Sequence, residues 1–193
     1  MTTFLLVRHG ETDWNRQRRF QGHADPPLNE RGRSQARQLA AVLAGEDLRA
    51  VYASPLRRAS ETAGIVARAL GLEVRLDRRL MEIDVGSWSG LTRPEIEARF
   101  PQAFARWRAG GRGWDAGETY GQLTERVLEA LHEIGGLHPG ESVLVVGHGG
   151  TVRSVLAHAA RLDLAAHRRA IGPAANCSVH RLALRDGVLV GVD

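Results

Sequence analysis

Two short apolar runs, one near each end of the chain, place the strongest constraint on the fold. The first runs from Phe4 to Val7 and the second from Val143 to Val146, with no polar residue in either. A strand that is apolar at every position is typical of the centre of a parallel sheet, where both faces are buried. Segments with helical spacing of apolar residues, such as residues 29–44, lie between such runs. We therefore predict a three-layer α/β/α sandwich with a mostly parallel sheet.

The other predicted elements continue this alternation. Ser54 has the side chain of an N-cap and Pro55 suits a first helical position, so a helix should begin there. Arg185-Asp186-Gly187 indicates a hairpin turn, which gives the sheet an antiparallel edge. The predicted strands are residues 3–8, 50–53, 73–76, 143–146, 178–184 and 188–192. The predicted helices are residues 29–44, 55–70, 119–134 and 150–161, with short helices starting at Pro94 and Pro101, and residues 77–91 and 110–117 irregular.

The size and charge of the chain exclude several classes of protein. A length of 193 residues suits a single domain, 1–193. All 26 basic residues are arginine, so a lysine Schiff base and a Walker phosphate loop are excluded. The net charge is only +4, the arginines are interspersed with Asp and Glu, and aromatic residues make up 5%. We therefore expect no binding of nucleic acid.

The cysteine content and the N-terminal sequence bear on the compartment. Cys177 is the single cysteine, so no intrachain disulfide can form, which fits a reducing compartment. The first apolar run has no basic segment before it and is too short for a signal peptide or a membrane span. We expect a cytoplasmic protein without membrane association.

Charged side chains follow three of the predicted strands. Arg8 and His9 come directly after the first strand, Arg58 lies in the loop and helix after residues 50–53, and His148 follows the strand at 143–146. Ligands in open α/β sheets bind at the carboxyl edge of the strands. Glu82, in the irregular segment, could reach the same edge. The sequence therefore predicts a cleft with two histidines, two arginines and one carboxylic acid.

These side chains suit phosphoryl transfer through a covalent intermediate. His9 would attack phosphorus in line, while Arg8, Arg58 and a protonated His148 would stabilise the charge on the phosphate oxygens. Glu82 would donate a proton to the leaving oxygen and later accept one from water. We expect no metal, because the required cations are side chains.

Glycines beside these residues suggest further contacts with phosphate. Gly10 and Gly149 would let backbone N–H groups approach the anion, and the helix after Gly149 would direct its N-terminus at it. Each residue also has a structural interpretation: a lone histidine after a strand is often structural, and Gly147 and Gly149 could serve only a tight turn. The other histidines show no metal-ligand spacing. They are His23, His132, His138, His158, His167 and His180.

In combination, these motifs resemble the histidine phosphatase superfamily, also called the phosphoglycerate mutase-like family. The resemblance covers nearly the whole chain, and the motifs occur in the family's order. The matching stretches are 6–12 with Trp14-Asn15, Gln21-Gly22 with Asp25, Pro27-Leu28 and Gly32, 54–59 with 61–63, Glu82 with Gly86, Trp88 and Gly90, Gly117-Glu118, and 146–150.

The resemblance implies a role for each matching residue. His9 would be the phosphorylated histidine, and Arg8 and Arg58 would form the phosphate clamp. His148 would be the second histidine of the site, and Glu82 the proton donor. The positions that match residues contacting phosphate or substrate in the family are Asn15, Gln21, Gly22 and Gly149.

The resemblance leaves three functions open. In a phosphatase, water takes the phosphoryl group from His9. In a phosphoglycerate mutase, the group returns to the sugar acid, with 2,3-bisphosphoglycerate as primer and the only cofactor. Mutases carry a longer insertion and a closing C-terminal tail, whereas here residues 88–118 form a small helical cap and the chain ends after the last strand. A less enclosed site admits water, which favours a phosphatase acting on a small-molecule phosphate ester. The third function is an inactive phospho-ligand sensor. The resemblance to the family also implies a possible homodimer.

Overall fold

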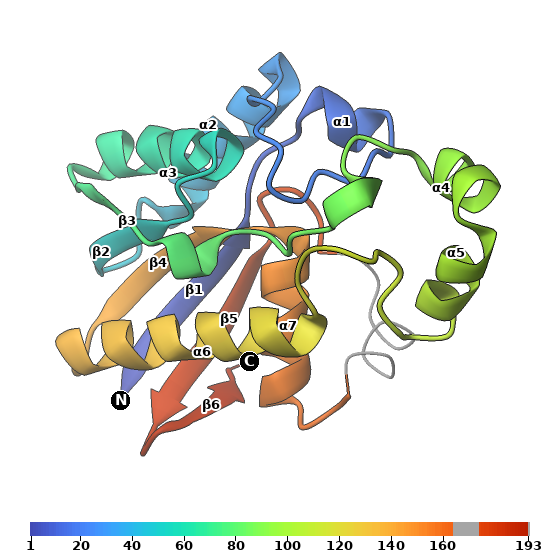
Figure 1. Ribbon diagram of the computed structural model, residues 1–193. Coiled ribbons are helices and arrows are strands. Elements are labelled where there is room, and N and C mark those ends of the chain that lie inside the picture. The colour runs from blue at the N-terminus through green and yellow to red at the C-terminus, as the bar shows by residue number, and fades with distance from the viewer. Residues whose placement is uncertain (164–173, 193) are drawn as a thin grey trace.

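The strands form one six-stranded sheet in the order β3-β2-β4-β1-β5-β6 (Figure 1). The computed structural model describes residues 1–163 and 174–192. β1 to β4 pair in parallel, and β5 and β6 add an antiparallel edge, as predicted. The strands are β1 (Thr2–Arg8), β2 (Leu48–Ala53), β3 (Val74–Leu76), β4 (Ser142–Gly147), β5 (Val179–Arg185) and β6 (Val188–Gly191).

Burial on both faces explains the apolar run in β1. Phe4 and Leu6 pack into the core on one side of the sheet, and Leu5 and Val7 into the core on the other. This follows from the alternation of side chains along a strand. β1 lies between β4 and β5, so its edges are covered as well. The sheet therefore presents the end of β1, at Arg8, near the middle of its carboxyl edge.

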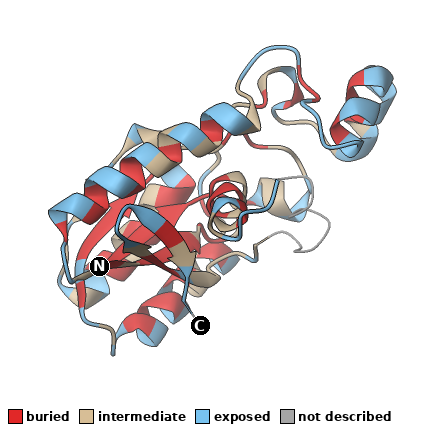
Figure 2. Ribbon diagram, turned by 90° about the horizontal axis from the view of Figure 1, so that it is seen from below, coloured by how far each residue is buried: buried red, intermediate tan, exposed pale blue. Residues whose placement is uncertain are grey.

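Helices cover both faces and complete the predicted three-layer sandwich. α2 and α3 pack on one face, and α6 and α7 on the other (Figures 1 and 2). Among the described residues, no helix is long and apolar enough to cross a membrane. The helices are α1 (Asp13–Arg16), α2 (Glu30–Leu43), α3 (Arg57–Leu70), α4 (Arg93–Arg99), α5 (Pro101–Arg108), α6 (Tyr120–Leu137) and α7 (Gly149–Ala159), with 3₁₀ turns η1 (Arg78–Leu80) and η2 (Gly86–Trp88).

The predicted start of α3 is wrong. The helix begins at Arg57, with Leu56 at the N-cap position, instead of at Pro55 after a Ser54 cap. The amide N–H of Arg57 donates to Oδ1 of Asp25 at 2.6 Å, so a carboxylate from another loop supplies the cap. The Ser54 hydroxyl contacts His148 instead. A side chain suited to capping is therefore used in the site.

Two other differences are a short helix that was not predicted and a helix that is longer than predicted. α1 was not predicted; its single turn is stabilised by a reciprocal capping box between Thr12 and Asn15. α6 continues to Leu137, three residues beyond the predicted end, through two consecutive glycines. Packing overrides the low helix propensity there, because Gly135 lies against Leu184 and Phe4.

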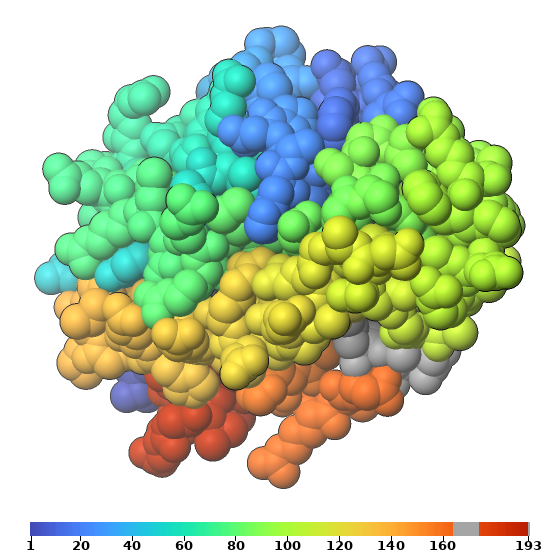
Figure 3. Space-filling model, in the orientation of Figure 1, coloured from blue at the N-terminus to red at the C-terminus, as the bar shows by residue number. Residues whose placement is uncertain are grey.

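The predicted cap contains α4 and α5 and the loop that leads to α6. In the space-filling view these residues form the right-hand edge of the molecule (Figure 3). Trp107 of α5 contacts Trp88 edge-on, with ring centroids 5.8 Å apart, and stacks on Phe104. Trp114 also contacts Trp88. These aromatic side chains belong to the same core cluster as α6, so the cap packs onto the body of the protein.

Candidate active site

The predicted catalytic residues meet at the carboxyl edge of the sheet. They line a cavity of about 830 Å³, within the range usual for small-molecule sites. His148 lies beside it, with its ring centroid 5.2 Å from that of His9. A smaller adjoining cavity of about 310 Å³ adds Gly22 and Gly149. The predicted residues lining the larger cavity are Arg8, His9, Asn15, Gln21, Arg58 and Glu82.

His9 is held as a neutral imidazole with its Nε2 unprotonated. Nδ1 lies 2.6 Å from the carbonyl oxygen of Gly10, which can only accept, so Nδ1 carries the proton and Nε2 a lone pair. Burial lowers the pKa of His9 well below its usual value, and the charges of Arg58 and Arg8 lower it further. Nδ2 of Asn176 donates to the His9 carbonyl at 2.8 Å and fixes the backbone. His9 is therefore available as a nucleophile at neutral pH.

His148 is also neutral in this structure. Burial lowers its pKa well below the usual value, followed by the charge of Arg58. Its Nε2 lies 2.8 Å from Oγ of Ser54, which itself accepts from the amide of Leu56 at 3.3 Å. This contact fixes the orientation of the imidazole ring. The protonated state expected from the sequence thus needs the negative charge of a bound phosphate, which raises a histidine pKa.

The two arginines are held by backbone carbonyls. Arg58 is fully buried and donates to the carbonyls of Ala24 at 2.7 Å and Gly22 at 2.8 Å. Arg8 donates to the carbonyl of Ala174 at 2.7 Å. Burial lowers the pKa of Arg58 to about 10, so it remains charged at neutral pH. Neutral acceptors thus fix the two cations while leaving their charges available to an anion.

Four buried polar atoms at the site have no hydrogen-bond partner within residues 1–163 and 174–192. Three are Nε of Arg8 and Nε of Arg58, which are donors, and Nδ1 of His148, which is a donor once the ring is protonated. The fourth is Oε1 of Gln21, the end of an amide that can also be placed with its N–H₂ group inward. Buried donors without a partner are costly, and a phosphate oxygen would satisfy them.

The predicted role of Gly10 is wrong, whereas Gly149 remains a candidate. The amide of Gly10 donates to Oγ1 of Thr62 at 3.0 Å, so it is not directed at a ligand. A side chain at Gly10 would meet the backbone of Gly32, so close packing between two loops requires this glycine. Gly149 is the first residue of α7 and lies beside the side chain of Arg8, where an added Cβ would be in van der Waals contact with the guanidinium group. Its amide belongs to the positive end of that helix.

The predicted binding residues line the two adjoining cavities. Oδ1 of Asn15 accepts from Thr12 in the capping box of α1, which leaves the amide N–H₂ of Asn15 for a ligand. Gln21 lines both cavities although the residue as a whole is only 8% exposed. Gly22 has φ of +51° and its carbonyl binds Arg58, so a left-handed backbone directs this loop at the arginine.

Glu82 is anchored at the N-terminus of α7. Its carboxylate accepts from the amide of Ile83 at 2.9 Å and from the amide of Gly150 at 3.1 Å. A side chain at position 150 would overlap the carboxylate, so only glycine permits this approach. Glu82 and His9 line the same cavity, so a carboxyl group and a neutral imidazole face one space.

Three further residues support the site but were not assigned to it from the sequence. Ser54 orients His148, Asn176 holds the backbone of His9, and Arg126 binds the backbone of Glu82. A signal existed for Asn176, because it precedes an antiparallel strand whose start must lie beside the end of β1. Arg126 lies in the middle of a helix, and nothing local distinguishes it from the other arginines.

Within the two described ranges, no cluster of three or more His, Cys, Asp or Glu side chains could hold a metal ion. His167 lies outside these ranges. The site has a buried neutral histidine, two fixed cations and a carboxyl group around one cavity, with a second histidine beside it. This constellation can bind a phosphate ester and transfer its phosphoryl group to His9.

The fold and this site together define an α/β protein that binds phosphate at the carboxyl edge of its sheet. Residues 4–191 match the family model of the histidine phosphatase superfamily (branch 1). The chain belongs to this family, as its motifs predicted. Its relatives support a phosphatase that acts on small phosphorylated metabolites.

Three curated relatives are similar over most of the chain. Phosphoserine phosphatase 1 of Hydrogenobacter thermophilus is 38% identical, over 85% of this chain and 79% of the relative. Phosphoglycerate mutase-like protein 4 of Arabidopsis thaliana is 42% identical, over 78% and 68%. A metal-independent phosphoserine phosphatase of the same plant is 37% identical, over 96% and 78%. The solved structure of YhfR from Bacillus stearothermophilus superposes with a TM-score of 0.90 at 35% identity, covering 100% of this chain and 96% of that one.

Proposed function

We propose that this protein hydrolyses small phosphomonoesters through a phosphohistidine formed on His9. The observation that supports this most strongly is that buried side-chain nitrogens of Arg8, Arg58 and His148, near a neutral His9, have no hydrogen-bond partner among the described residues. Nε2 of His9 attacks phosphorus, the bond to the ester oxygen breaks, and the equatorial oxygens take the three donors. Glu82 protonates the leaving oxygen and then accepts a proton from the water that releases phosphate. No step needs a metal ion or another cofactor.

We propose a phosphorylated carboxylic acid as the substrate class. The relatives named phosphoserine phosphatases support this, because phosphoserine carries a carboxylate near its phosphate. Arg18 and Arg93 also line the larger cavity and supply positive charge for a second anionic group. The lack of an intrachain disulfide supports action in the cytoplasm. We propose that the partner is a small molecule rather than a nucleic acid or a membrane.

The test of turnover uses O-phosphoserine and 3-phosphoglycerate in the presence of EDTA, with trace 2,3-bisphosphoglycerate. Free phosphate and 2-phosphoglycerate are both followed. Phosphate release without isomerisation is expected. Isomerisation without phosphate release would make the protein a mutase, and binding without either product would make it a sensor.

The test of the intermediate is acid-labile, base-stable labelling of the protein after rapid mixing with radiolabelled substrate. His9→Ala is expected to lose the label and to lower kcat by about 10³-fold or more, since the nucleophile is gone. His158→Ala removes an exposed histidine of α7 and serves as control. Labelling that survives in His9→Ala would refute the assignment of the nucleophile.

A further inference from the structure

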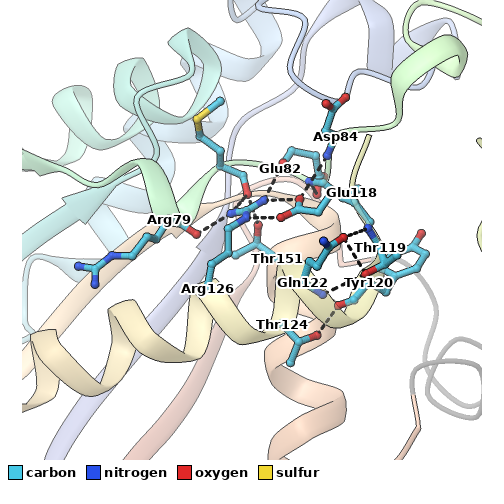
Figure 4. Close-up of polar contacts among 12 residues, drawn as sticks. Arg79, Glu82, Asp84, Glu118, Thr119, Tyr120, Gln122, Thr124, Arg126 and Thr151 are labelled. Atoms are coloured by element: carbon cyan, nitrogen blue, oxygen red, sulfur yellow. Dashed lines mark hydrogen bonds and ion pairs between the residues drawn. The ribbon is translucent and has the colours of Figure 1, made fainter. Parts of the chain in front are cut away.

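Arg126, on the face of α6 towards the site, uses its whole guanidinium group to bind the segment that carries Glu82. Its Nε and one terminal nitrogen donate to the two carboxylate oxygens of Glu118, at 2.6 and 2.7 Å. The remaining donors bind the carbonyl oxygens of Arg79 at 2.6 Å, Met81 at 2.9 Å and Glu82 at 3.0 Å. All five N–H donors of this arginine are therefore used (Figure 4).

These contacts replace the hydrogen bonds that regular secondary structure would supply. Residues 81–85 follow the 3₁₀ turn η1 and belong to no helix or strand. Carbonyl groups there need donors, and Arg126 provides one to each of Met81 and Glu82, and another to Arg79 in η1. Thr151 of α7 also donates to the carbonyl of Met81, at 3.3 Å. The position of this irregular segment thus depends on side chains from α6 and α7.

Glu118 extends the contact with this segment to Asp84. Its amide donates to the carbonyl of Asp84 at 2.9 Å, and the amide of Asp84 lies 3.4 Å from its carboxylate. The side chains of Glu118 and Arg126 are only 16% and 20% exposed, and their charges offset each other. A bidentate arginine–carboxylate pair has a fixed geometry, so it can hold a backbone segment in one place.

We propose that Arg126, oriented by Glu118, is a positioning residue for the general acid Glu82. The inference rests on the proposed function, in which Glu82 protonates the leaving oxygen. Arg126 touches neither the cavity nor the substrate. It fixes the peptide of Glu82, and the amides of Ile83 and Gly150 then fix the carboxylate beside His9. Lysine could not replace it, because a single ammonium group cannot bind five acceptors in a plane.

The test compares two substrates that differ in their need for a general acid. p-Nitrophenyl phosphate has a leaving group that departs without a proton, whereas O-phosphoserine releases an alkoxide that needs one. Arg126→Lys and Glu118→Gln are expected to lower kcat/KM for O-phosphoserine at least about tenfold more than for p-nitrophenyl phosphate. Glu82→Gln removes the proposed general acid itself, so it gives the largest difference in kcat/KM loss between the two substrates that is expected. Equal losses for both substrates, or no loss, would overturn the proposal.

Arg79→Gln is the matched control. Arg79 lies in the same segment, but its side chain points away from the cluster and forms ion pairs with Asp77 and Glu133 (Figure 4). In Arg79→Gln, the ratio of kcat/KM for O-phosphoserine to kcat/KM for p-nitrophenyl phosphate should equal that of the wild type, even if the thermal stability of the variant falls. If Arg126→Lys does not fold, Glu118→Gln gives an independent reading, since it keeps the shape of the pair. Wild-type protein that hydrolyses neither substrate would refute the proposed function itself, a result distinct from equal losses in the variants.

Discussion

His9 and His148 couple the chemistry of the site to the stability of the fold. The pKa values of both are depressed in the folded protein, first by burial. In the unfolded chain they return to about 6.5, so below that pH the unfolded state binds more protons than the folded state. The free energy of unfolding must therefore fall as the pH drops below about 6.5. An ordinary exposed histidine makes no such contribution.

We predict a loss of about 1 kcal/mol per buried histidine between pH 7.5 and 5.5, because one pKa unit corresponds to about 1.4 kcal/mol. Urea unfolding across this range measures it. His9→Gln should flatten the dependence, whereas His158→Gln, at an exposed position, should leave it unchanged. An identical slope in wild type and His9→Gln would show that the buried imidazole takes up its proton without cost.

Two adjacent glycines in α6 provide a prediction at the level of the element. A methyl group at Gly136 would meet open space, whereas one at Gly135 would meet the side chains of Leu184 and Phe4. Alanine is favoured over glycine in a helix by about 0.5–1 kcal/mol. Gly136→Ala should therefore raise the free energy of unfolding by about that amount, and Gly135→Ala should be less stable than Gly136→Ala. Urea denaturation of the two variants measures the difference, and equal stabilities would contradict the packing described for α6.

The elements show which parts of the structure are readable from local sequence. The strands and long helices were predicted because apolar periodicity and burial are local patterns. Ser54 was assigned to a cap because its actual partner, His148, is 94 residues away. The meeting of Arg8, His9, Arg58 and His148 followed from strand ends, which topology brings to one edge, whereas Glu82 comes from an irregular segment and was assigned by the resemblance to the family. The contacts of Arg126 could not be predicted, because they involve carbonyls of an irregular segment.

At the scale of the whole molecule, the cap and the body share one core. Trp107 of α5 packs with Trp88, and both belong to the cluster that includes α6 and one face of the sheet. A cap joined in this way should unfold together with the domain. It differs from a lid that hinges on a few exposed residues.

We predict that Trp107→Ala destabilises the whole protein, by about 3–5 kcal/mol, as for other large aromatic side chains removed from a core. Tryptophan fluorescence and far-UV circular dichroism should still report one coincident unfolding transition. Two separate transitions, with the fluorescence change first, would show that the cap melts independently.

The bond from Asn176 to the His9 backbone joins residues 167 positions apart, and Arg8 is tied to Ala174 over a similar separation. His9 therefore reaches its final place only when nearly the entire polypeptide has folded. Contacts so distant along the chain form late, because closing long loops is slow. During refolding from urea, we expect helical circular dichroism to recover before phosphate release. The time course of recovered phosphate release would then report the last event in folding, which is the pairing of β5 with β1.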